Sequence, residues 1–310
     1  MPPQNTPGWN YGFTGLDEIE VHPLMKFLIP ALTILPVVLI FGIFTTKRET
    51  TSAITSSRPA LEPGNVVRSP VIVELFTSEG CSSCPPADAV LTQLQKTQPV
   101  AGAEVITLSE HVDYWNYIGW SDPFSSAAFS ARQETYAQAF RSERVYTPQM
   151  VVDGQTEFVG SSLDKAREAI AKAARSPKAD VRISIPQSKN EKDTQAIRLN
   201  ASVKNVPPIT KGDLAEVILV ITEDHLSSNV SRGENSGRKL AHTGVVREMR
   251  ALGAVDPATK SFDSETTAVI ANGWKRDDLR AVVLVQERAH RRVLGAAVLH
   301  LAAMSQSRNR

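Results

Sequence analysis

The chain has 310 residues, of which 42% are apolar and 22% are charged, and its formal net charge is +1. This length allows about two domains beside a tail, and the composition is that of an ordinary globular chain. A charge so close to neutral excludes strong electrostatic attraction to nucleic acid or to anionic lipid. We therefore expect no nucleic-acid partner, and we expect no cofactor.

The first 65 residues are predicted to lie outside the folded part of the chain. Residues 1–25 show no sustained periodicity and are expected to be disordered. Residues 26–46 contain an uncharged run from Phe27 to Phe44, which is at the lower limit of length for a helix that crosses a bilayer. Residues 47–65 are rich in Thr, Ser and Pro and are predicted to form a linker.

The uncharged run is predicted to be either a signal peptide or a transmembrane anchor. Met25-Lys26 resembles the start of a secretory signal, but no A-x-A cleavage site follows, which favours an uncleaved anchor. The flanking charges conflict with export, because Lys47 and Arg48 follow the run and such residues favour the cytoplasmic side.

The segment 66–178 is predicted to be the first folded domain, and it begins with a C-x-x-C motif. An apolar run, Val71 to Phe76, precedes Cys81 and Cys84, the only cysteines of the sequence, and a helical pattern follows from Ala87 to Lys96. A C-x-x-C pair between a strand and a helix is typical of thiol–disulfide chemistry. An inert structural disulfide is a second interpretation. Half of a zinc site is a third, although no second cysteine pair supplies the other ligands.

The predicted elements after the motif alternate between strands and helices. They are a strand at 104–108, a helix from Asp122-Pro123 to about Arg141, a short strand before Asp153, a strand at 157–160 and a helix over 162–174. Asp153-Gly154 predicts a hairpin turn between the two short strands. The order β-α-β-α-β-β-α favours a layered α/β domain.

From about Ala179 the pattern changes to short strands separated by polar turns. The candidates are 181–185, 197–203, 215–221, 281–285 and 293–299. They favour a β-sandwich over 179–304, followed by a disordered tail over 305–310. A polar stretch between Leu226 and Arg250 contains Arg232 and His242, and it is expected to be a solvated hairpin loop. Binding an anion, or reaching over the cysteines, are its alternative roles.

Four segments carry a resemblance to a known family: 73–88 (VELFTSEGCSSCPPAD), 111–126 (HVDYWNYIGWSDPFSS), 146–154 (YTPQMVVDG) and 232–247 (RGENSGRKLAHTGVVR). Together they resemble a bacterial family of exported thioredoxin-like proteins called domain of unknown function 1223. The resemblance covers nearly everything from Val66 to the end of the chain. It implies export, and it is the main reason to prefer export over the charge pattern.

The resemblance and the element pattern together predict an α/β fold class. It consists of a thioredoxin-like domain followed by a C-terminal β-sandwich-like domain, with an N-terminal hydrophobic signal or anchor helix. The protein is expected to be exported and anchored in the cytoplasmic membrane by that helix, facing the periplasm or the extracellular side. The oligomeric state is left open.

The resemblance to the thioredoxin superfamily implies roles for five residues. Cys81 is implied as the attacking thiolate and Cys84 as the resolving thiol. Thr147-Pro148 matches the cis-proline segment that faces such a pair, and X-Pro is the bond type in which a cis isomer costs little. Glu74 matches the buried carboxylate that exchanges a proton with the second cysteine, and the alternative is that its side chain faces outward at a sheet edge.

Two residues depart from the pattern of that superfamily. Gly80 stands where an aromatic residue usually precedes the first cysteine. Pro85 follows Cys84 and disfavours helical geometry there, so the helix is expected to start late and to act less strongly on Cys81.

The predicted function is that of a thiol–disulfide oxidoreductase acting on thiols or disulfides of other exported proteins. One alternative is a metal-binding or copper-delivery protein with Cys81, Cys84 and His111 as ligands, because thiolates suit Cu(I). Another is a non-catalytic interaction module with a structural disulfide. His111 has a further interpretation as a structural hydrogen-bond partner. Trp115, Tyr117 and Trp120 are expected either to line a peptide or ligand groove or to pack as a lid over a small core.

Overall fold

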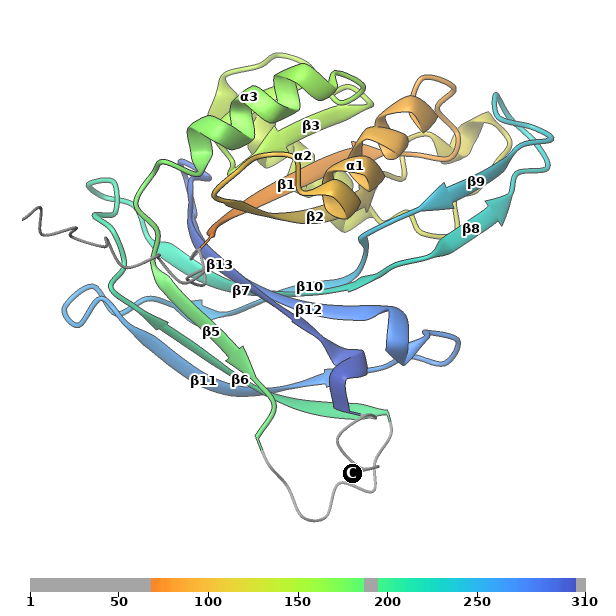
Figure 1. The fold of residues 1–310 in the computed structure, drawn as a ribbon. Coiled ribbons are helices and arrows are strands. Elements are labelled where there is room, and N and C mark those ends of the chain that lie inside the picture. The colour runs from red at the N-terminus through yellow and green to blue at the C-terminus, as the bar shows by residue number, and fades with distance from the viewer. Residues whose placement is uncertain (1–67, 187–194, 305–310) are drawn as a thin grey trace, which may run out of the picture. The chain divides into compact units, whose positions relative to one another are not determined.

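The computed structural model describes residues 68–186 and 195–304 (Figure 1). All of them belong to one compact unit that spans residues 61–310. The predicted N-terminal tail, the uncharged run from Phe27 to Phe44, the linker and the C-terminal tail 305–310 lie outside the described residues. Among the helices of the described ranges, none is both long and apolar enough to span a membrane.

An eight-stranded sheet runs through this unit in the order β13-β12-β7-β10-β2-β1-β3-β4 (Figure 1). Its strands are β1 (Ser69–Thr77), β2 (Ala103–His111), β3 (Gln149–Val152), β4 (Thr156–Val159), β7 (Ala215–Glu223), β10 (Val245–Ala254), β12 (Leu279–Glu287) and β13 (Val293–His300). β2 pairs in parallel with both β1 and β10, and the other neighbours are antiparallel.

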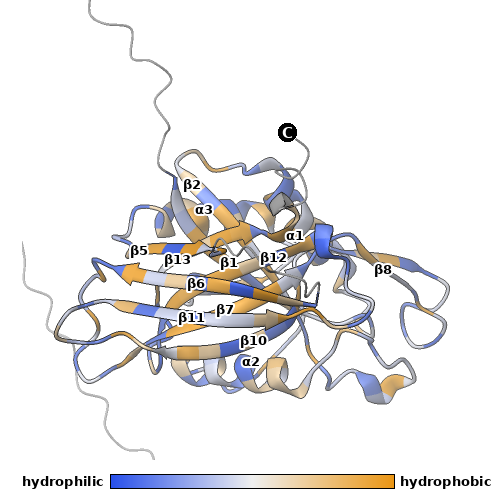
Figure 2. Ribbon diagram, turned by 90° about the horizontal axis from the view of Figure 1, so that it is seen from below, coloured by the Kyte–Doolittle hydropathy of each residue, from blue (hydrophilic) through white to orange (hydrophobic). Residues whose placement is uncertain are grey.

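Three helices and a second sheet cover the large sheet. The helices are α1 (Pro85–Thr97), α2 (Ala127–Phe140) and α3 (Leu163–Ala173), and the short 3-10 segments are η1 (Asn116–Ile118), η2 (Arg276–Asp278) and η3 (Leu301–Met304). The second sheet has the order β11-β6-β5, where β5 is Asp180–Ser184, β6 is Ala196–Lys204 and β11 is Phe262–Val269 (Figure 2). A two-stranded ribbon is formed by β8 (Leu226–Asn229) and β9 (Lys239–His242).

The alternation of side chains along β1 decides which helix each residue meets. Val71, Val73 and Leu75 point to one face, where they pack against α1 and α3. Ile72 points to the other face and shares a core with Phe129 of α2. Farther along the sheet, one face of β7 and β12 belongs to this same core, and their other face packs against β6 of the second sheet. Residues on α1 and residues on α2 therefore approach β1 from opposite sides.

The predicted fold class, a thioredoxin-like domain followed by a separate β-sandwich-like domain, is wrong, whereas the N-terminal anchor helix that the same prediction included lies outside the described residues. The fold is mixed α/β, and strands from both predicted segments form the same eight-stranded sheet. The two sets of strands meet where β2 pairs with β10, since Val245 is the partner of Ser109. There the N–H of Ser109 donates to the carbonyl oxygen of Gly244 over 2.7 Å.

The error has a physical cause in β10. The sequence pattern does not predict this strand, because Arg247, Glu248 and Arg250 interrupt its apolar residues and much of it is only half-buried. A central strand normally shows a buried apolar face, and β10 shows one only at its start. Without β10, the later strands have no visible link to β2 and resemble a sandwich of their own.

Most of the individual elements were predicted at nearly their observed positions, and the hairpin turn is confirmed by the positive φ angles of Asp153 (48°) and Gly154 (67°). The helix expected from Asp122 begins instead at Ala127. Ser126 is its N-cap, and the Ser126 hydroxyl accepts a hydrogen bond from the N–H of Ala128. Asp122 does not cap this helix because its carboxylate accepts hydrogen bonds from the N–H groups of Glu79 and Phe124.

Candidate functional site

Cys81 and Cys84 form a disulfide at the start of α1. Cys84 is the N-cap residue, with φ −77° and ψ −39°, and Pro85 is the first helical residue. The side chains are buried, since only 1% of Cys81 and 0% of Cys84 is exposed. Pro85 and Pro86 have no N–H, so this helix end offers a thiolate fewer hydrogen-bond donors than usual.

A loop from a distant part of the sequence covers this disulfide. We call residues 230–238 the covering loop, and it connects β8 to β9. The buried Asn235 amide donates to the carbonyl oxygens of both Glu79 and Cys81, each over 2.9 Å. The Glu234 carboxylate accepts a hydrogen bond from the N–H of Ser82 over 2.9 Å. The loop thus reaches over the cysteines, which was one of the alternatives for this stretch.

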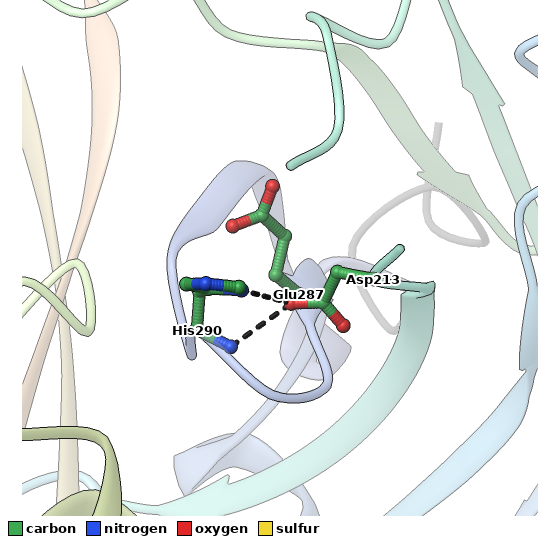
Figure 3. Close-up of side chains that lie close together, drawn as sticks. All are labelled: Asp213, Glu287 and His290. Carbon is green, nitrogen blue, oxygen red and sulfur yellow. Dashed lines mark hydrogen bonds and ion pairs between the residues drawn. The ribbon is translucent and has the colours of Figure 1, made fainter. Parts of the chain in front are cut away.

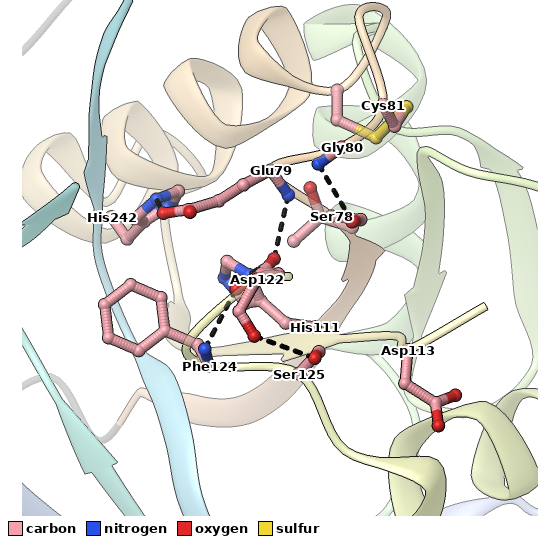
Figure 4. A network of polar contacts seen from close by, with 12 residues as sticks. Ser78, Glu79, Gly80, Cys81, His111, Asp113, Asp122, Phe124, Ser125 and His242 are labelled. Atoms are coloured by element: carbon pink, nitrogen blue, oxygen red, sulfur yellow. Dashed lines mark hydrogen bonds and ion pairs between the residues drawn. A yellow bond between two sulfur atoms is a disulfide. The ribbon is translucent and has the colours of Figure 1, made fainter. Parts of the chain in front are cut away.

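Buried titratable side chains lie next to the segment that leads from Ser78 to Cys81 (Figure 4). We call them the buried cluster, and its members are Glu79, Asp88, His111, Asp122 and His242. His111 Nδ1 lies 2.7 Å from Asp122 Oδ2, and His242 Nε2 lies 2.9 Å from Glu79 Oε1. The two imidazole rings are 4.8 Å apart, centre to centre. Two imidazole–carboxylate pairs are therefore in direct contact in the interior.

Burial and neighbouring charges act on these groups in opposite directions. Burial alone would lower the pKa of His111, but Asp122, together with Asp88 and Glu79, outweighs it and the pKa is raised. Burial alone would raise the pKa of Asp122, but His111, together with hydrogen bonds from the N–H groups of Glu79 and Phe124, outweighs it and the pKa is lowered. At Asp88 burial dominates, so its pKa is raised although His242 and His111 oppose the shift. Asp88 therefore keeps its proton to a higher pH than an ordinary aspartate.

One nitrogen of each imidazole lacks a hydrogen-bond partner. His111 Nε2 and His242 Nδ1 are both buried and unpaired within the part of the chain that the structure describes. The ring of Phe124 lies against both imidazoles, with 5.5 Å between ring centres in each case. Among the described residues, one nitrogen of each ring is thus left without a hydrogen bond beside an aromatic side chain.

Asp88 links the buried cluster to the cysteines. It follows Cys84 by four residues on α1, so the two side chains lie on the same face of the helix. Its N–H donates to the carbonyl oxygen of Cys84 over 3.1 Å, and its carboxylate accepts a hydrogen bond from Thr77 over 2.9 Å. Our interpretation of the sequence missed this residue. The signal that could have found it is the spacing from the second cysteine to the aspartate.

Thr147-Pro148 lies near the cysteines through Trp115. The Thr147–Pro148 peptide bond is cis. The indole N–H of Trp115 donates to the Thr147 hydroxyl over 2.8 Å. A Cβ atom added to Gly80 would lie 3.1 Å from the Cβ of Trp115. Trp115 therefore occupies the space beside Gly80, which gives a physical reason for the glycine at that position.

Glu74 lies on the opposite side of β1 from the cysteines. Its side chain faces α2, where its Oε2 lies 2.6 Å from the guanidinium of Arg132 and its other oxygen accepts a hydrogen bond from Tyr136. Burial alone would raise the pKa of Glu74, but Arg132, together with the hydrogen bond from Tyr136 and the charge of Arg291, outweighs it and the pKa is lowered. The structure therefore holds Glu74 as the ionised partner of Arg132 and does not bring it to Cys84.

The structure also does not gather His111 and the two sulfurs into one ligand set. Within the described ranges, the group of three candidate ligands whose atoms lie within 4.8 Å of one another is Asp213, Glu287 and His290 (Figure 3). Asp213 accepts hydrogen bonds from the main chain and the ring of His290, and Glu287 lies 2.6 Å from Arg292. Both carboxylates already accept hydrogen bonds from protein groups, so we interpret the three residues as a contact that stabilises a loop and not as a metal site.

The chain has detectable relatives. The family described as "Protein of unknown function (DUF1223)" matches residues 72–286. A crystal structure of a protein from Agrobacterium tumefaciens is 24% identical, has a TM-score of 0.56 and covers 76% of this chain and 95% of its own. HBP35 of Porphyromonas gingivalis is 15% identical, with a TM-score of 0.54 and 76% coverage of each chain. Both indicate a shared fold and nothing more. No curated protein matches the chain.

Proposed function

The chain belongs to the DUF1223 family of proteins of unknown function, and we propose that it is a thiol–disulfide oxidoreductase that works through Cys81 and Cys84. The observation that carries this proposal is the position of the pair, at the start of α1 and beside the buried cluster. A purely structural disulfide would not need two imidazole–carboxylate pairs in its immediate surroundings. Perturbed titratable groups collect at functional sites more often than elsewhere.

The reaction is a two-step thiol–disulfide exchange. A partner thiolate attacks the sulfur of Cys81, so that a partner–Cys81 bond forms and the Cys81–Cys84 bond breaks. Cys84 leaves as a thiolate and takes up a proton. A second partner thiolate then attacks the partner sulfur of the mixed disulfide and releases Cys81. The partner loses two electrons and the cysteine pair gains two, and the reverse sequence reduces a partner.

We assign the proton transfer at Cys84 to Asp88 rather than to Glu74. Asp88 shares a helix face with Cys84, is 8% exposed and has a raised pKa because it is buried. Its hydrogen bond from Thr77 holds the carboxyl group in place. Glu74 is committed to Arg132 on the other face of β1. The two unpaired imidazole nitrogens of the buried cluster extend the proton store behind Asp88.

A partner can reach Cys81 only if the covering loop moves, because Asn235 and Glu234 fasten it to both sides of the cysteine. Removal of these contacts would expose a surface next to the aromatic segment of η1. Tyr117 in that segment is 84% exposed, which makes it a candidate contact for a polypeptide partner. We therefore place partner docking between the covering loop and Tyr117.

Trapping of mixed disulfides tests the exchange reaction. Replacing Cys84 by serine removes the resolving thiol, so Cys84→Ser should accumulate covalent complexes with partner proteins. A thiol reductant should separate these complexes again. Cys81→Ser is the matched control, and it should accumulate none. Non-reducing electrophoresis followed by mass spectrometry detects both outcomes. If neither variant forms complexes while both lose stability, the disulfide is structural and the proposal fails.

The reduction potential of the pair gives an independent measurement. A value between about −270 and −120 mV is typical of catalytic pairs, whereas structural disulfides lie below about −300 mV. We expect the first range for the full chain, measured by equilibration with glutathione or dithiothreitol. Replacing Asp88 by asparagine should slow the exchange without breaking the disulfide. A value below about −300 mV would contradict the proposal.

We also propose that residues 68–304 work outside the cytoplasm. A disulfide persists in oxidising compartments and is reduced in the cytosol, and the uncharged run from Phe27 to Phe44 would supply the signal or anchor. A reporter enzyme that is active only after export, fused behind Arg310, tests this. Activity of a cytoplasmic reporter in its place would reject the location.

A further inference from the structure

A cleft of about 660 Å³ lies on the α2 side of the large sheet, away from the face that carries α1. Its walls come from the segment before α2, from α2 itself, from β10, from the loop at Trp274 and from the turn between β12 and β13. This volume is within the range of small-molecule sites, which spans about 300–1,000 Å³. The cleft shares no lining residue with the cysteine site or the buried cluster.

The wall of the cleft contains an arginine with unused donors. Arg291 is 8% exposed, and its Nε is buried without a hydrogen-bond partner. Within the described ranges its side chain makes no hydrogen bond or ion pair, and its guanidinium lies 5.0 Å from the ring centre of Tyr136. A guanidinium offers five N–H donors and stays charged at all ordinary pH values. Leaving it unpaired in the interior costs free energy unless an anion completes it.

The other charges around Arg291 leave one positive charge uncompensated. Arg132 also lines the cleft, but the ionised Glu74 neutralises it at 2.6 Å. Burial raises the pKa of Glu110 well above its ordinary value, so this neighbour keeps its proton to a higher pH than an ordinary glutamate, although its Oε1 lies 3.4 Å from the Nε of Arg132. With Glu110 protonated, the two arginines and the ionised Glu74 leave this group with one positive charge in excess. One singly charged anion balances it, whereas a doubly charged anion does not.

Apolar and aromatic side chains make up part of the remaining walls, beside the polar Ser125, Ser126 and Thr135 and beside Glu248, which is paired with Arg250. The apolar and aromatic side chains include Phe129, Met249 and Trp274. The guanidinium of Arg247 lies between two rings, 5.5 Å from that of Phe124 and 5.1 Å from that of Trp274, so Arg247 is held as part of the wall. A hydrocarbon or aromatic body would find van der Waals partners on these surfaces.

We propose that this cleft binds a small apolar monocarboxylate. Its carboxylate pairs with the unused donors of Arg291, and its body lies among Phe129, Met249 and Trp274. A planar carboxylate matches the fork of a guanidinium, which can form two parallel hydrogen bonds to it. Ligand binding at this site is separate from the cysteine chemistry, so either proposal can fail without the other.

Calorimetric titration of the full chain tests the ligand class. The probes are phenylacetate, octanoate, the neutral phenylacetamide and the doubly charged phenyl phosphate. We expect saturable binding of at least one of the two carboxylates, with weaker binding of the amide and of the phosphate. The proposal is overturned if neither carboxylate binds, or if the amide or the phosphate binds as tightly as the better carboxylate.

Three variants locate the site. Arg291→Met should weaken carboxylate binding by about 10-fold to 100-fold, because a hydrogen-bonded charge is lost. Arg288→Met is the matched control: it removes one positive charge from the same turn, at an exposed arginine paired with Glu216, and should leave binding unchanged. Ala131→Trp fills the cleft from an exposed position on α2 and should abolish binding.

Circular dichroism must show that each variant is folded. If Arg291→Met does not fold, Ala131→Trp decides the question alone. Unchanged carboxylate binding in a folded Ala131→Trp variant, or equal losses in Arg291→Met and Arg288→Met, would overturn the proposal.

Discussion

The side-chain amide of Asn235 donates a hydrogen bond to the carbonyl oxygen of Cys81 across 154 positions of the sequence. The same amide donates to Glu79, so one buried side chain holds the main chain just before and at the first cysteine. Asn235, which shields the disulfide, lies in the C-terminal half of the chain, whereas Cys81, which forms it, lies in the N-terminal half. We therefore expect the C-terminal half to control access to Cys81.

Asn235→Ala should make the disulfide more reactive. Two buried carbonyl oxygens lose their donor, which costs about 1–3 kcal/mol of folding free energy and loosens the covering loop. We expect faster reduction by dithiothreitol, followed by mass spectrometry of alkylated thiols, and a lower urea midpoint for the oxidised protein. Ser236→Ala is the control, because this exposed hydroxyl bonds only to the main chain of Ser231. Equal reduction rates in the two variants would show that the loop does not control access.

Asp122→Asn should destabilise the protein most at low pH. His111 faces Asp122, Asp88 and Glu79, and its pKa is raised in the folded state, so protonated His111 favours folding. That contribution is complete below the unfolded pKa of 6.5 and is lost as the pH rises through the folded pKa. Denaturation in urea should therefore show a larger cost of the substitution near about pH 5.5 than near about pH 9.

An exposed pair is the control for this pH dependence. His225 lies 2.8 Å from Asp278, and 74% of the His225 side chain is exposed. Asp278→Asn should change stability by less than about 1 kcal/mol at either pH, since solvent screens such pairs. If Asp122→Asn costs the same at both pH values, His111 is not charged in the folded protein.

The motif that the sequence makes most conspicuous was located correctly, but the groups around it were not. The C-x-x-C pair was placed between a strand and a helix because apolar periodicity is local information. The apolar residues of β1, before the pair, and of α1, after it, show that periodicity. His242 and Asn235 come from a polar stretch whose partners are more than 150 residues away. Such contacts leave no periodic signal, so only the three-dimensional structure brings them to Cys81.

Glu74 illustrates a second limit. Alternation along β1 shows that Glu74 and Leu75 point to opposite faces, but not which face α1 covers. The resemblance assigned Glu74 to the cysteines, whereas the structure pairs it with Arg132 on α2. Asp88 was overlooked because a single aspartate in the first turn of a helix is usually explained by the helix dipole. Its burial, which gives it a perturbed pKa, is a property of the packed fold.

Glu110→Gln should stabilise the protein at alkaline pH. Glu110 is fully buried beside Glu74, and neither of its oxygens has a hydrogen-bond partner among the described residues. Burial raises its pKa, so the folded state binds a proton that the unfolded state has released above its ordinary pKa of 4.5. Stability is therefore lost as the pH rises from that value, and a neutral glutamine avoids the loss. Urea denaturation near about pH 4 and about pH 8 should show the gain only at the higher value.

Glu74→Gln is the contrasting variant for that experiment. It leaves the charge of Arg132 without its partner in the interior, and breaking such a buried pair costs about 3–5 kcal/mol. The pKa of Glu74 is lowered, so this cost should be present at neutral pH and should shrink as the pH falls through the folded pKa. Near about pH 8 we expect Glu110→Gln to stabilise the protein and Glu74→Gln to destabilise it. A stability change in the same direction for both variants would contradict the assigned charges.

Gly244→Ala should destabilise the joint between the two sets of strands. Gly244 has a φ of +65°, and an added Cβ would lie 2.8 Å from the carbonyl oxygen of Thr107 on β2. The left-handed conformation and the clash together should cost about 2–5 kcal/mol in urea denaturation. Gly212→Ala is the matched control, because its φ is +84° and nothing lies within 4 Å of an added Cβ, so only the conformational cost of about 1–2 kcal/mol remains. If the two substitutions cost the same, close packing of β10 on β2 does not hold the eight-stranded sheet together.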